Sequence, residues 1–271
     1  MHKAKKTGNN NFMTKKLYIC LNKTNKNLEK MTNLFLPLIA DVTGNVNDPV
    51  NFTFFIGCMA MMAASAFFFL SLNQFDKKWR NSVLVSGLIT FIAAVHYWYM
   101  RDAAMAGSLD NVTAFRYVDW ILTVPLMCVE FYLILKVAGA TKNLMWKLIG
   151  LSTVMLVCGY IGETGDNAVI WGTISGLAYF AIAYMIWFGE AKALATEAGG
   201  DVLQAHKYLC WFVLVGWAIY PLGYMDGTTG WYDALPTEGL LDINVWYNIA
   251  DAINKIGFGL VVYALACKKT S

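Results

Sequence analysis

An aspartate and a lysine lie four residues apart in the last apolar stretch of the sequence, at Asp251 and Lys255. On a helix this spacing puts both side chains on one face, where they can pair. The pair is either a salt bridge that neutralises itself or a reactive amine with its counter-ion. Desolvation favours the neutral amine, which condenses with an aldehyde, and the protonated imine that results needs a carboxylate such as Asp251.

A second set of polar side chains lies on one stripe of an earlier apolar stretch. Arg116, Asp119 and Thr123 are spaced by three and four residues, which places them on one helix face. Glu130 follows Asp119 by about three helical turns, with ~20° of drift and ~16 Å of rise. A structural network could explain Arg116 and Asp119, but nothing nearby balances Glu130. Two carboxylates on one stripe therefore favour a proton relay whose centre lies between them.

Other residues in the apolar stretches could surround such a centre. His96 is either a satisfied buried histidine or a further member of the ionisable set. Pro125 and Pro221 would kink their helices, which is tolerated where neighbours re-satisfy the backbone. Four aromatic residues could enclose a flat polyene, although each alone is more often a packing residue: Trp120, Trp217, Tyr220 and Tyr247.

The composition indicates how these residues are positioned. The chain has 271 residues, of which 58% are hydrophobic and 14% charged, whereas a soluble domain carries about a quarter charged residues. Each apolar block has about the ~20 residues needed to cross a bilayer, and none alternates as barrel strands do. We therefore expect an all-α membrane protein, one bundle of seven transmembrane helices. The seven blocks are 50–72, 80–100, 113–136, 143–162, 168–189, 206–226 and 242–267.

Charges in the loops predict the orientation of this bundle. The loops after the first, third and fifth blocks and the carboxyl-terminal tail carry Lys77, Lys78, Arg80, Lys136, Lys142, Lys147, Lys192, Lys207, Lys268 and Lys269. Past Met31, the opposite loops carry Arg101 with Asp102, Asp110, Asp166, Asp226, Asp233 and Glu238. The positive-inside rule then puts the amino terminus outside and the carboxyl terminus in the cytoplasm.

Residues 1–30 differ from the rest of the chain. They are rich in Lys and Asn and hold eight lysines against the single acid Glu29, which leaves 13 basic and 17 acidic residues elsewhere. They contain no signal-peptide core. We expect a disordered extension, or an upstream mis-start before Met31, followed by one seven-helix domain over 31–271. The remaining surface is not basic enough to suggest nucleic acid, and the six scattered cysteines suit packing.

Several separated motifs carry a resemblance to a known family. They are Phe115–Leu126 (FRYVDWILTVPL), Glu130–Leu133 (EFYL), Gly159–Glu163 (GYIGE), Gly216–Tyr224 (GWAIYPLGY) and Tyr247–Lys255 (YNIADAINK). The sequence from about 50 to 267 resembles the proteorhodopsins, a group of the microbial (type I) rhodopsins.

The resemblance implies a light-driven outward proton pump of the prokaryotic inner membrane, which is a transporter and not an enzyme. All-trans retinal would be bound to Lys255 as a protonated Schiff base, with Asp119 and Asp251 as counter-ions. Light would isomerise it, Asp119 would accept the proton, Glu130 would return one from the cytoplasm, and Arg116 would direct release outward. Trp120, Trp217, Tyr220, Pro221 and Tyr247 would line the retinal pocket.

Finer properties follow from single positions of the same resemblance. Asp119, Thr123 and Glu130 resemble the set of the outward proton pumps, since the sodium and chloride pumps have other residues there. His96 matches the histidine that hydrogen-bonds the primary acceptor. Met127 takes the colour-tuning position, where an apolar residue resembles the green absorbers and Gln the blue ones.

Some alternatives stay open. Gly172 and Gly176 could leave a side window for a carotenoid antenna, although helix packing explains such glycines more often. The family implies a homo-oligomer, a pentamer or hexamer. A sensory photoreceptor would share the retinal chemistry, but such proteins usually lack a donor like Glu130. A seven-helix receptor or transporter without retinal would leave Lys255, Asp251 and Asp119 as coincidence.

Overall fold

The computed structural model describes residues 48–228, 230–231 and 242–270, and the elements in these ranges are helical. Seven stretches are long and apolar enough to cross a membrane, which confirms the predicted seven-helix fold. They are Pro49–Gln74, Lys77–Met105, Val112–Ala138, Lys142–Thr164, Ala168–Ala198, Gly200–Gly227 and Ile243–Thr270. The predicted extension over 1–30 lies outside the described residues.

The elements follow the predicted blocks closely, and the fifth and sixth spans each contain two α-helices. The first four spans contain α2 (Pro49–Ser71), η1 (Leu72–Gln74), α3 (Lys77–Met105), α4 (Leu109–Leu135), η2 (Lys136–Ala138) and α5 (Lys142–Thr164). The last three contain α6 (Ala168–Trp187), α7 (Glu190–Ala198), α8 (Gly200–Trp211), η3 (Phe212–Gly216), α9 (Ile219–Gly227) and α10 (Ile243–Thr270).

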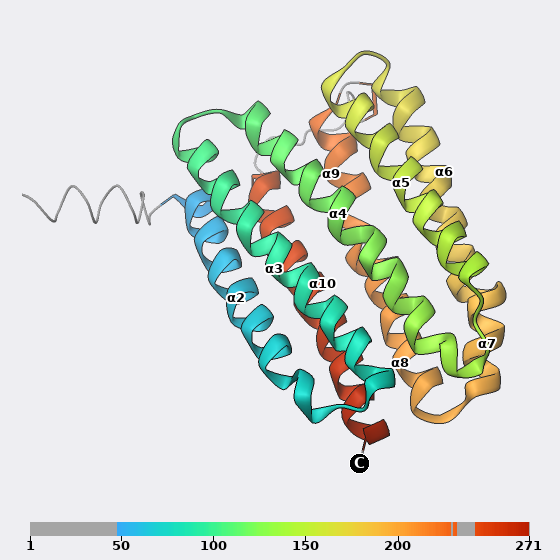
Figure 1. Cartoon of the computed structure of the whole chain (residues 1–271). Helices are drawn as coiled ribbons and strands as arrows, with labels where there is room; N and C mark the ends of the chain where they lie inside the picture. Colours follow the sequence, from blue (N-terminus) through green and yellow to red (C-terminus); the bar gives the residue numbers. More distant parts are fainter. Residues whose placement is uncertain (1–47, 229, 232–241, 271) are drawn as a thin grey trace, which may run out of the picture. The chain divides into compact units, whose positions relative to one another are not determined.

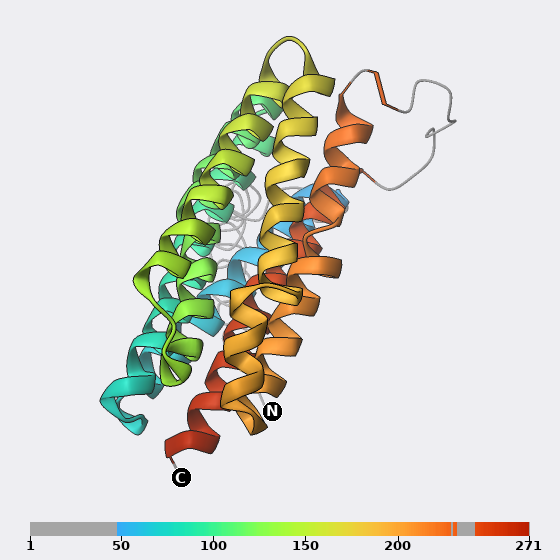
Figure 2. The same cartoon turned by 90° about the vertical axis from the view of Figure 1, so that its right-hand side faces the viewer.

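Helices of the unit from Asp48 onward run side by side (Figures 1 and 2). The last helix, α10, contacts α2 and α3 on one side and α8 and α9 on another, and α4 contacts α3, α5 and α10. Helix α10 therefore lies within the bundle, and its polar face meets α4. The described chain enters α2 at one end of the bundle and leaves α10 at the other (Figure 1).

Local sequence signals explain where several helices begin and end. The Asp48 side chain accepts a hydrogen bond from the amide of Val50 at 3.1 Å, and Pro49 occupies the first helical position of α2. After α4, the short η2 ends at Gly139, which has a φ of 86°. Because glycine adopts this left-handed conformation without steric cost, the chain turns there and starts α5.

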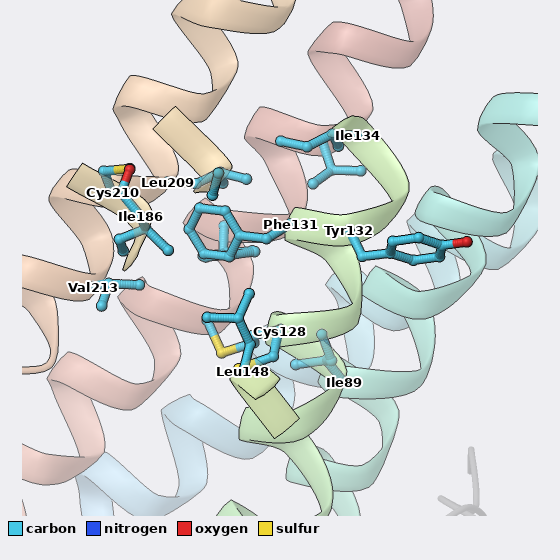
Figure 3. Close-up of a cluster of buried hydrophobic side chains, with 14 of the residues drawn as sticks. Ile89, Cys128, Phe131, Tyr132, Ile134, Leu148, Ile186, Leu209, Cys210 and Val213 are labelled. Carbon is cyan, nitrogen blue, oxygen red and sulfur yellow. The ribbon is translucent and has the colours of Figure 1, made fainter. Parts of the chain in front are cut away.

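Apolar side chains both fill and coat the bundle. Buried residues of α3, α4, α5, α6 and α8 pack together around Phe131, and Figure 3 shows its ring directed toward Ile186, Leu209 and Cys210. The outer faces are apolar as well, with Leu70 82% and Phe188 76% exposed. A helix that is apolar all round suits a bilayer better than water.

The sixth span is interrupted between α8 and α9 by the π-helical η3. Tyr179 of α6 donates from its hydroxyl to the carbonyls of Val213 and Leu214, at 3.1 and 3.0 Å. Pro221 lies downstream of the interruption, inside α9, and Pro125 lies inside α4, which is continuous through it. The break in the sixth span thus precedes its proline, and neighbouring side chains satisfy the carbonyls there.

Candidate functional site

Lys255 is at the centre of the site. Its side chain is 2% exposed, and its Nζ contacts Oδ2 of Asp119 on α4 and lies 2.6 Å from Oδ2 of Asp251 on α10. The i, i+4 pairing predicted from the spacing is present, and a second carboxylate joins it from another helix. A buried amine with two carboxylates gives the site an excess of one negative charge when all three are ionised.

The two carboxylates differ in their remaining partners. Oδ1 of Asp251 accepts hydrogen bonds from Nε1 of Trp120 at 3.3 Å and from the hydroxyl of Tyr220 at 3.1 Å. Oδ1 of Asp119 is buried and has no hydrogen-bond partner among the described residues. The hydroxyl of Thr123 donates to the backbone carbonyl of Asp119, at 2.9 Å, and not to its carboxylate. Asp119 therefore has an open acceptor atom beside the amine.

Arg116 is one turn before Asp119 and points away from it. Its guanidinium donates to Oδ1 of Asn244 at 2.8 Å and lies over the ring of Tyr247, 4.9 Å from its centroid. Asp119 and Arg116 form no ion pair within the ranges that the structure describes. The arginine is thus held at the start of α10, between the Lys255 centre and the end of the bundle at which α2 begins.

His96 lies on α3 and is half-buried. Its Nδ1 is 2.8 Å from the carbonyl oxygen of Ile92 on the same helix. The hydrogen bond to Asp119 that the resemblance implies is not among those found in the described part of the chain, and it stays a prediction.

Glu130 is fully buried, toward the end of the bundle where α10 terminates. Its Oε1 accepts a hydrogen bond from the hydroxyl of Ser86 on α3, and its Oε2 has no partner among the described residues. A buried carboxylate with one hydrogen bond is costly to ionise, so the neutral acid is the favoured form. The predicted second carboxylate of the stripe is thus present, and separate from the Lys255 centre.

An apolar cavity of about 600 Å³ adjoins the amine, which is the size of a typical cofactor site. The predicted aromatic residues meet beside it, since the ring of Trp120 lies 4.9 Å from that of Tyr220 and 5.7 Å from that of Tyr247, centroid to centroid. The residues predicted to hold a polyene all line the cavity: Trp120, Met127, Trp217, Tyr220, Pro221, Tyr247 and Lys255. A long apolar aldehyde fits this arrangement, because among the described residues the Lys255 amine is the one basic group on the cavity wall.

The cavity also extends to the glycines of α6. A Cβ at Gly172 would lie 2.5 Å from Cε1 of Tyr224 and 3.0 Å from Cζ2 of Trp231, so two aromatic side chains cover that position. A Cβ at Gly176 would meet nothing within 4 Å. The predicted side window is therefore covered at Gly172 and open at Gly176.

Comparison with known proteins places this site in a family. The family model described as bacteriorhodopsin-like protein matches residues 48–269, which is most of the chain. The chain belongs to this family.

Within the bacteriorhodopsin-like proteins, this chain belongs with the proteorhodopsins. It is 40% identical over 240 residues to a green-light absorbing proteorhodopsin of Gamma-proteobacterium EBAC31A08, covering 87% of this chain and 94% of that protein. It is equally similar, over 242 residues and with the same coverage, to a blue-light absorbing proteorhodopsin of Gamma-proteobacterium Hot 75m4. With seven apolar spans, this rhodopsin is a multi-pass protein of the prokaryotic cell membrane.

Solved structures agree with this assignment. The blue light-absorbing proteorhodopsin from Med12 is 39% identical with a TM-score of 0.67, covering 82% of this chain and all of that one. Xanthorhodopsin, described as a light-driven ion pump with dual chromophore, is 31% identical with a TM-score of 0.71, covering 82% of this chain and 93% of that one.

Four polar residues of this rhodopsin site were not singled out by sequence reasoning. Ser86 binds Glu130, Asn244 binds Arg116, Asn254 donates to the carbonyl of Gly216 at 2.9 Å, and Glu163 accepts from the hydroxyl of Tyr117 at 2.7 Å. Serine and asparagine carry no charge, so they do not stand out in an apolar stretch as ionisable residues do. Glu163 carried a usable signal, because it is a carboxylate at the end of an apolar stretch.

Proposed function

We propose that this rhodopsin is a light-driven outward proton pump that binds all-trans retinal through Lys255. The observation that carries the proposal is the Lys255 amine, buried at the wall of an apolar cavity and in contact with Asp119 and Asp251. Retinal bound there would supply a light-driven isomerisation, which changes the direction and the strength with which the Lys255 nitrogen holds its proton. Residues of the chain itself would accept, release and return the proton.

Asp119 is the residue that we expect to accept the proton from the Lys255 nitrogen. Its Oδ1 is open, whereas Asp251 receives hydrogen bonds from Trp120 and Tyr220 that stabilise its ionised form. Asp251 would remain the fixed counter-ion. Asp119 would thus accept the proton, and Asp251 would keep its negative charge.

The proton would leave toward the end of the bundle at which α2 begins. Arg116 lies on that side, and Tyr117, the next residue on α4, donates to Glu163 near the end of α5. A positive guanidinium next to the exit favours the departure of a proton from its surroundings. Lysines at the opposite end support the cytoplasmic placement of that end, so the direction of transport would be outward.

Glu130 would return a proton from the cytoplasmic side. It is buried, favoured in its neutral form, and hydrogen-bonded to Ser86, so it can give up a proton once the Lys255 nitrogen has lost its own. The donor also speaks against a sensory photoreceptor, the alternative function of the same fold, because a signalling protein does not require fast reprotonation.

Light-induced pH change tests the proposal. Cells that express the protein with retinal, in unbuffered salt, should acidify the medium under illumination, and a protonophore should abolish the signal. Asp119→Asn should remove it. A coloured, well-expressed protein without any pH change would favour the sensory photoreceptor. A protein that stays colourless after retinal addition, or that does not bleach with hydroxylamine in light, would contradict retinal binding.

The proposal also includes the colour of the absorbed light and the oligomeric state. Met127 is buried and lines the cavity. Because an apolar residue at this colour-tuning position resembles the green absorbers, we expect green absorption. We further expect a homo-oligomer, a pentamer or hexamer, which native mass spectrometry of the detergent-solubilised protein would test.

A carotenoid antenna is a second candidate function at the same site. The supporting observation is that the cavity extends along α6 to Gly176 and to Leu177 and Phe180, which are 66% and 64% exposed. Tyr224 and Trp231 limit the space at Gly172. Addition of a hydroxylated carotenoid should give energy transfer to retinal in the excitation spectrum, and its absence would leave retinal as the one chromophore.

A further inference from the structure

His206 of α8 is a fully buried histidine for which the proposed proton path has no role so far. Its Nε2 lies 2.8 Å from the carbonyl oxygen of Ile186, in the last turn of α6. Carbonyls of a last turn have no partner within their own helix, and this one is satisfied by the imidazole. Because a carbonyl can only accept, Nε2 carries the hydrogen, and the lone pair of the neutral ring is at Nδ1.

Nδ1 of His206 is buried and has no partner among the described residues, and the same is true of Oε2 of Glu130. Both groups lie in the half of the bundle where α10 terminates. Phe131 lies next to both groups. It follows Glu130 on α4, and its ring centroid is 5.6 Å from that of the His206 imidazole. Figure 3 shows Phe131 directed toward Ile186 and Cys210, the residues around His206. Buried polar atoms without protein partners are usually satisfied by water.

We propose that His206 is the group through which protons reach Glu130 from the cytoplasm. Nδ1 would take a proton from the cytoplasmic solution, while Nε2–H stays on Ile186. Once Glu130 is ionised, the Nδ1 proton would pass through water to Oε2 of Glu130, and the neutral ring would be restored. One proton enters and one leaves in each cycle. The inference rests on the proposed pump and adds a residue to its uptake path.

The surroundings of His206 suit brief protonation. Phe131 of α4 offers a ring within cation–π reach of an imidazolium. Burial disfavours a lasting positive charge on the ring, and Lys192 of α7 adds to this effect, so a proton taken up by the ring is readily released. On α8, Sγ of Cys210 lies 3.3 Å from Nε2, and α6 presents the Ile186 carbonyl. These are the titratable and polar groups that face the ring in the described residues.

A purely structural histidine, which only ties α8 to α6, makes a different prediction. His206→Gln keeps an amide donor for Ile186 but has no basic nitrogen, and Cys210→Ser is a matched control that leaves the imidazole in place. In retinal-loaded protein, the recovery of absorbance after a flash at a fixed pH near neutrality should be as fast in Cys210→Ser as in wild type. In His206→Gln it should be at least about tenfold slower, and added imidazole should restore part of the rate, because a soluble base then carries protons in place of the ring. An unchanged rate in His206→Gln, or a slow rate that imidazole does not restore, would overturn the inference.

A second readout needs no retinal and no pumping. The sequence has three histidines, so ¹⁵N-histidine NMR of the dark apoprotein can identify His206 by the signal that His206→Gln lacks. We expect the Nε2–H tautomer when neutral, and protonation at Nδ1 as the pH falls, with the Ile186 hydrogen bond kept. An Nδ1–H tautomer, or protonation that breaks the Ile186 hydrogen bond, would contradict the proposal.

The two failures are distinguishable. If wild type pumps and Glu130→Gln slows recovery while His206→Gln recovers at the wild-type rate, the His206 inference alone fails. If wild type shows no light-induced pH change, the proposed pump fails, and the uptake role fails with it. If His206→Gln does not fold, His206→Asn and the wild-type NMR titration still decide the matter.

Discussion

Asp119 and Asp251 approach the Lys255 amine from different helices, and in the described residues Asp251 alone has its second oxygen hydrogen-bonded. Two carboxylates that look equivalent in the sequence are thereby made unequal. Trp120 and Tyr220 stabilise charge on Asp251, and the open Oδ1 of Asp119 leaves room for a proton. In the proposed pump, this asymmetry separates the proton acceptor from the permanent counter-ion.

We first predict unequal effects of removing the two carboxylates. Asp119→Asn should lower proton transport by at least about 10²-fold, because it removes the proposed proton acceptor, whereas Asp251→Asn should reduce it less. Asp119→Asn should also shift the visible band to the red, since a counter-ion is lost. The measurements are light-induced pH change per coloured protein and the absorption spectrum. Equal loss of transport in both variants would contradict the assignment.

The second prediction concerns Glu130 and the serine that binds it. Glu130→Gln should slow the return of absorbance after a flash by about 10²-fold, because it removes the proposed proton donor. Ser86→Ala should change the same rate by up to about tenfold, because the free energy of one hydrogen bond to the carboxyl group corresponds to a factor of about that size. Thr90→Val is the control one turn away on α3, since Thr90 donates to the backbone carbonyls of Ser86 and Gly87. An effect of Thr90→Val as large as that of Ser86→Ala would point to a general disturbance of α3.

The sequence predicted the helices and the charged centre well, for physical reasons. Apolar blocks of membrane length leave few alternatives to helices, and buried charges are rare enough that Asp119, Glu130, Asp251 and Lys255 stand out. The i, i+4 rule placed Asp251 beside Lys255 correctly, because both belong to one helix.

What the sequence could not predict depends on contacts between helices. The preference of Trp120 and Tyr220 for Asp251 arises from the packing of α4 and α9 on α10. The direction of Arg116 toward Asn244 depends likewise on how α4 meets α10. The spacing along one helix shows which side chains share a face. It does not show which side chain of a neighbouring helix each of them contacts.

The third prediction is a change of colour at Met127. This side chain is 2% exposed and lines the cavity, so a substitution there acts on the chromophore directly. Met127→Gln should move the visible band to the blue, because an amide dipole near the polyene opposes the shift of positive charge on excitation. Met127→Leu, which introduces no dipole, should leave the band nearly in place. Equal bands in all three proteins would show that residue 127 does not tune absorption.

The fourth prediction concerns the exit side, where Tyr117 donates to Glu163 at 2.7 Å. Tyr117→Phe removes one hydrogen bond to a carboxylate, worth about 1.5–3 kcal/mol, so proton release should change in rate by about tenfold or more. A pH-sensitive dye in the medium, read after a flash, measures this release. Tyr160→Phe is the control, because Tyr160 packs against the ring of Tyr117 and lies nearer the surface. Release that is insensitive to both substitutions would remove the pair from the exit path.

The final prediction is one of stability, at the interruption of the sixth span. Tyr179 donates to the carbonyls of Val213 and Leu214 in η3, and it comes from α6, so its hydroxyl links two spans. Tyr179→Phe keeps the ring but leaves these buried carbonyls without that donor, which should cost about 1–3 kcal/mol. The thermal midpoint of helix loss in detergent, followed by circular dichroism, should fall, and Tyr184→Phe on the exposed face of α6 should not change it. An unchanged midpoint for Tyr179→Phe would mean that other groups satisfy the π-helical carbonyls. A lower midpoint with unchanged colour would show instead that the hydroxyl stabilises the broken helix independently of the Lys255 site.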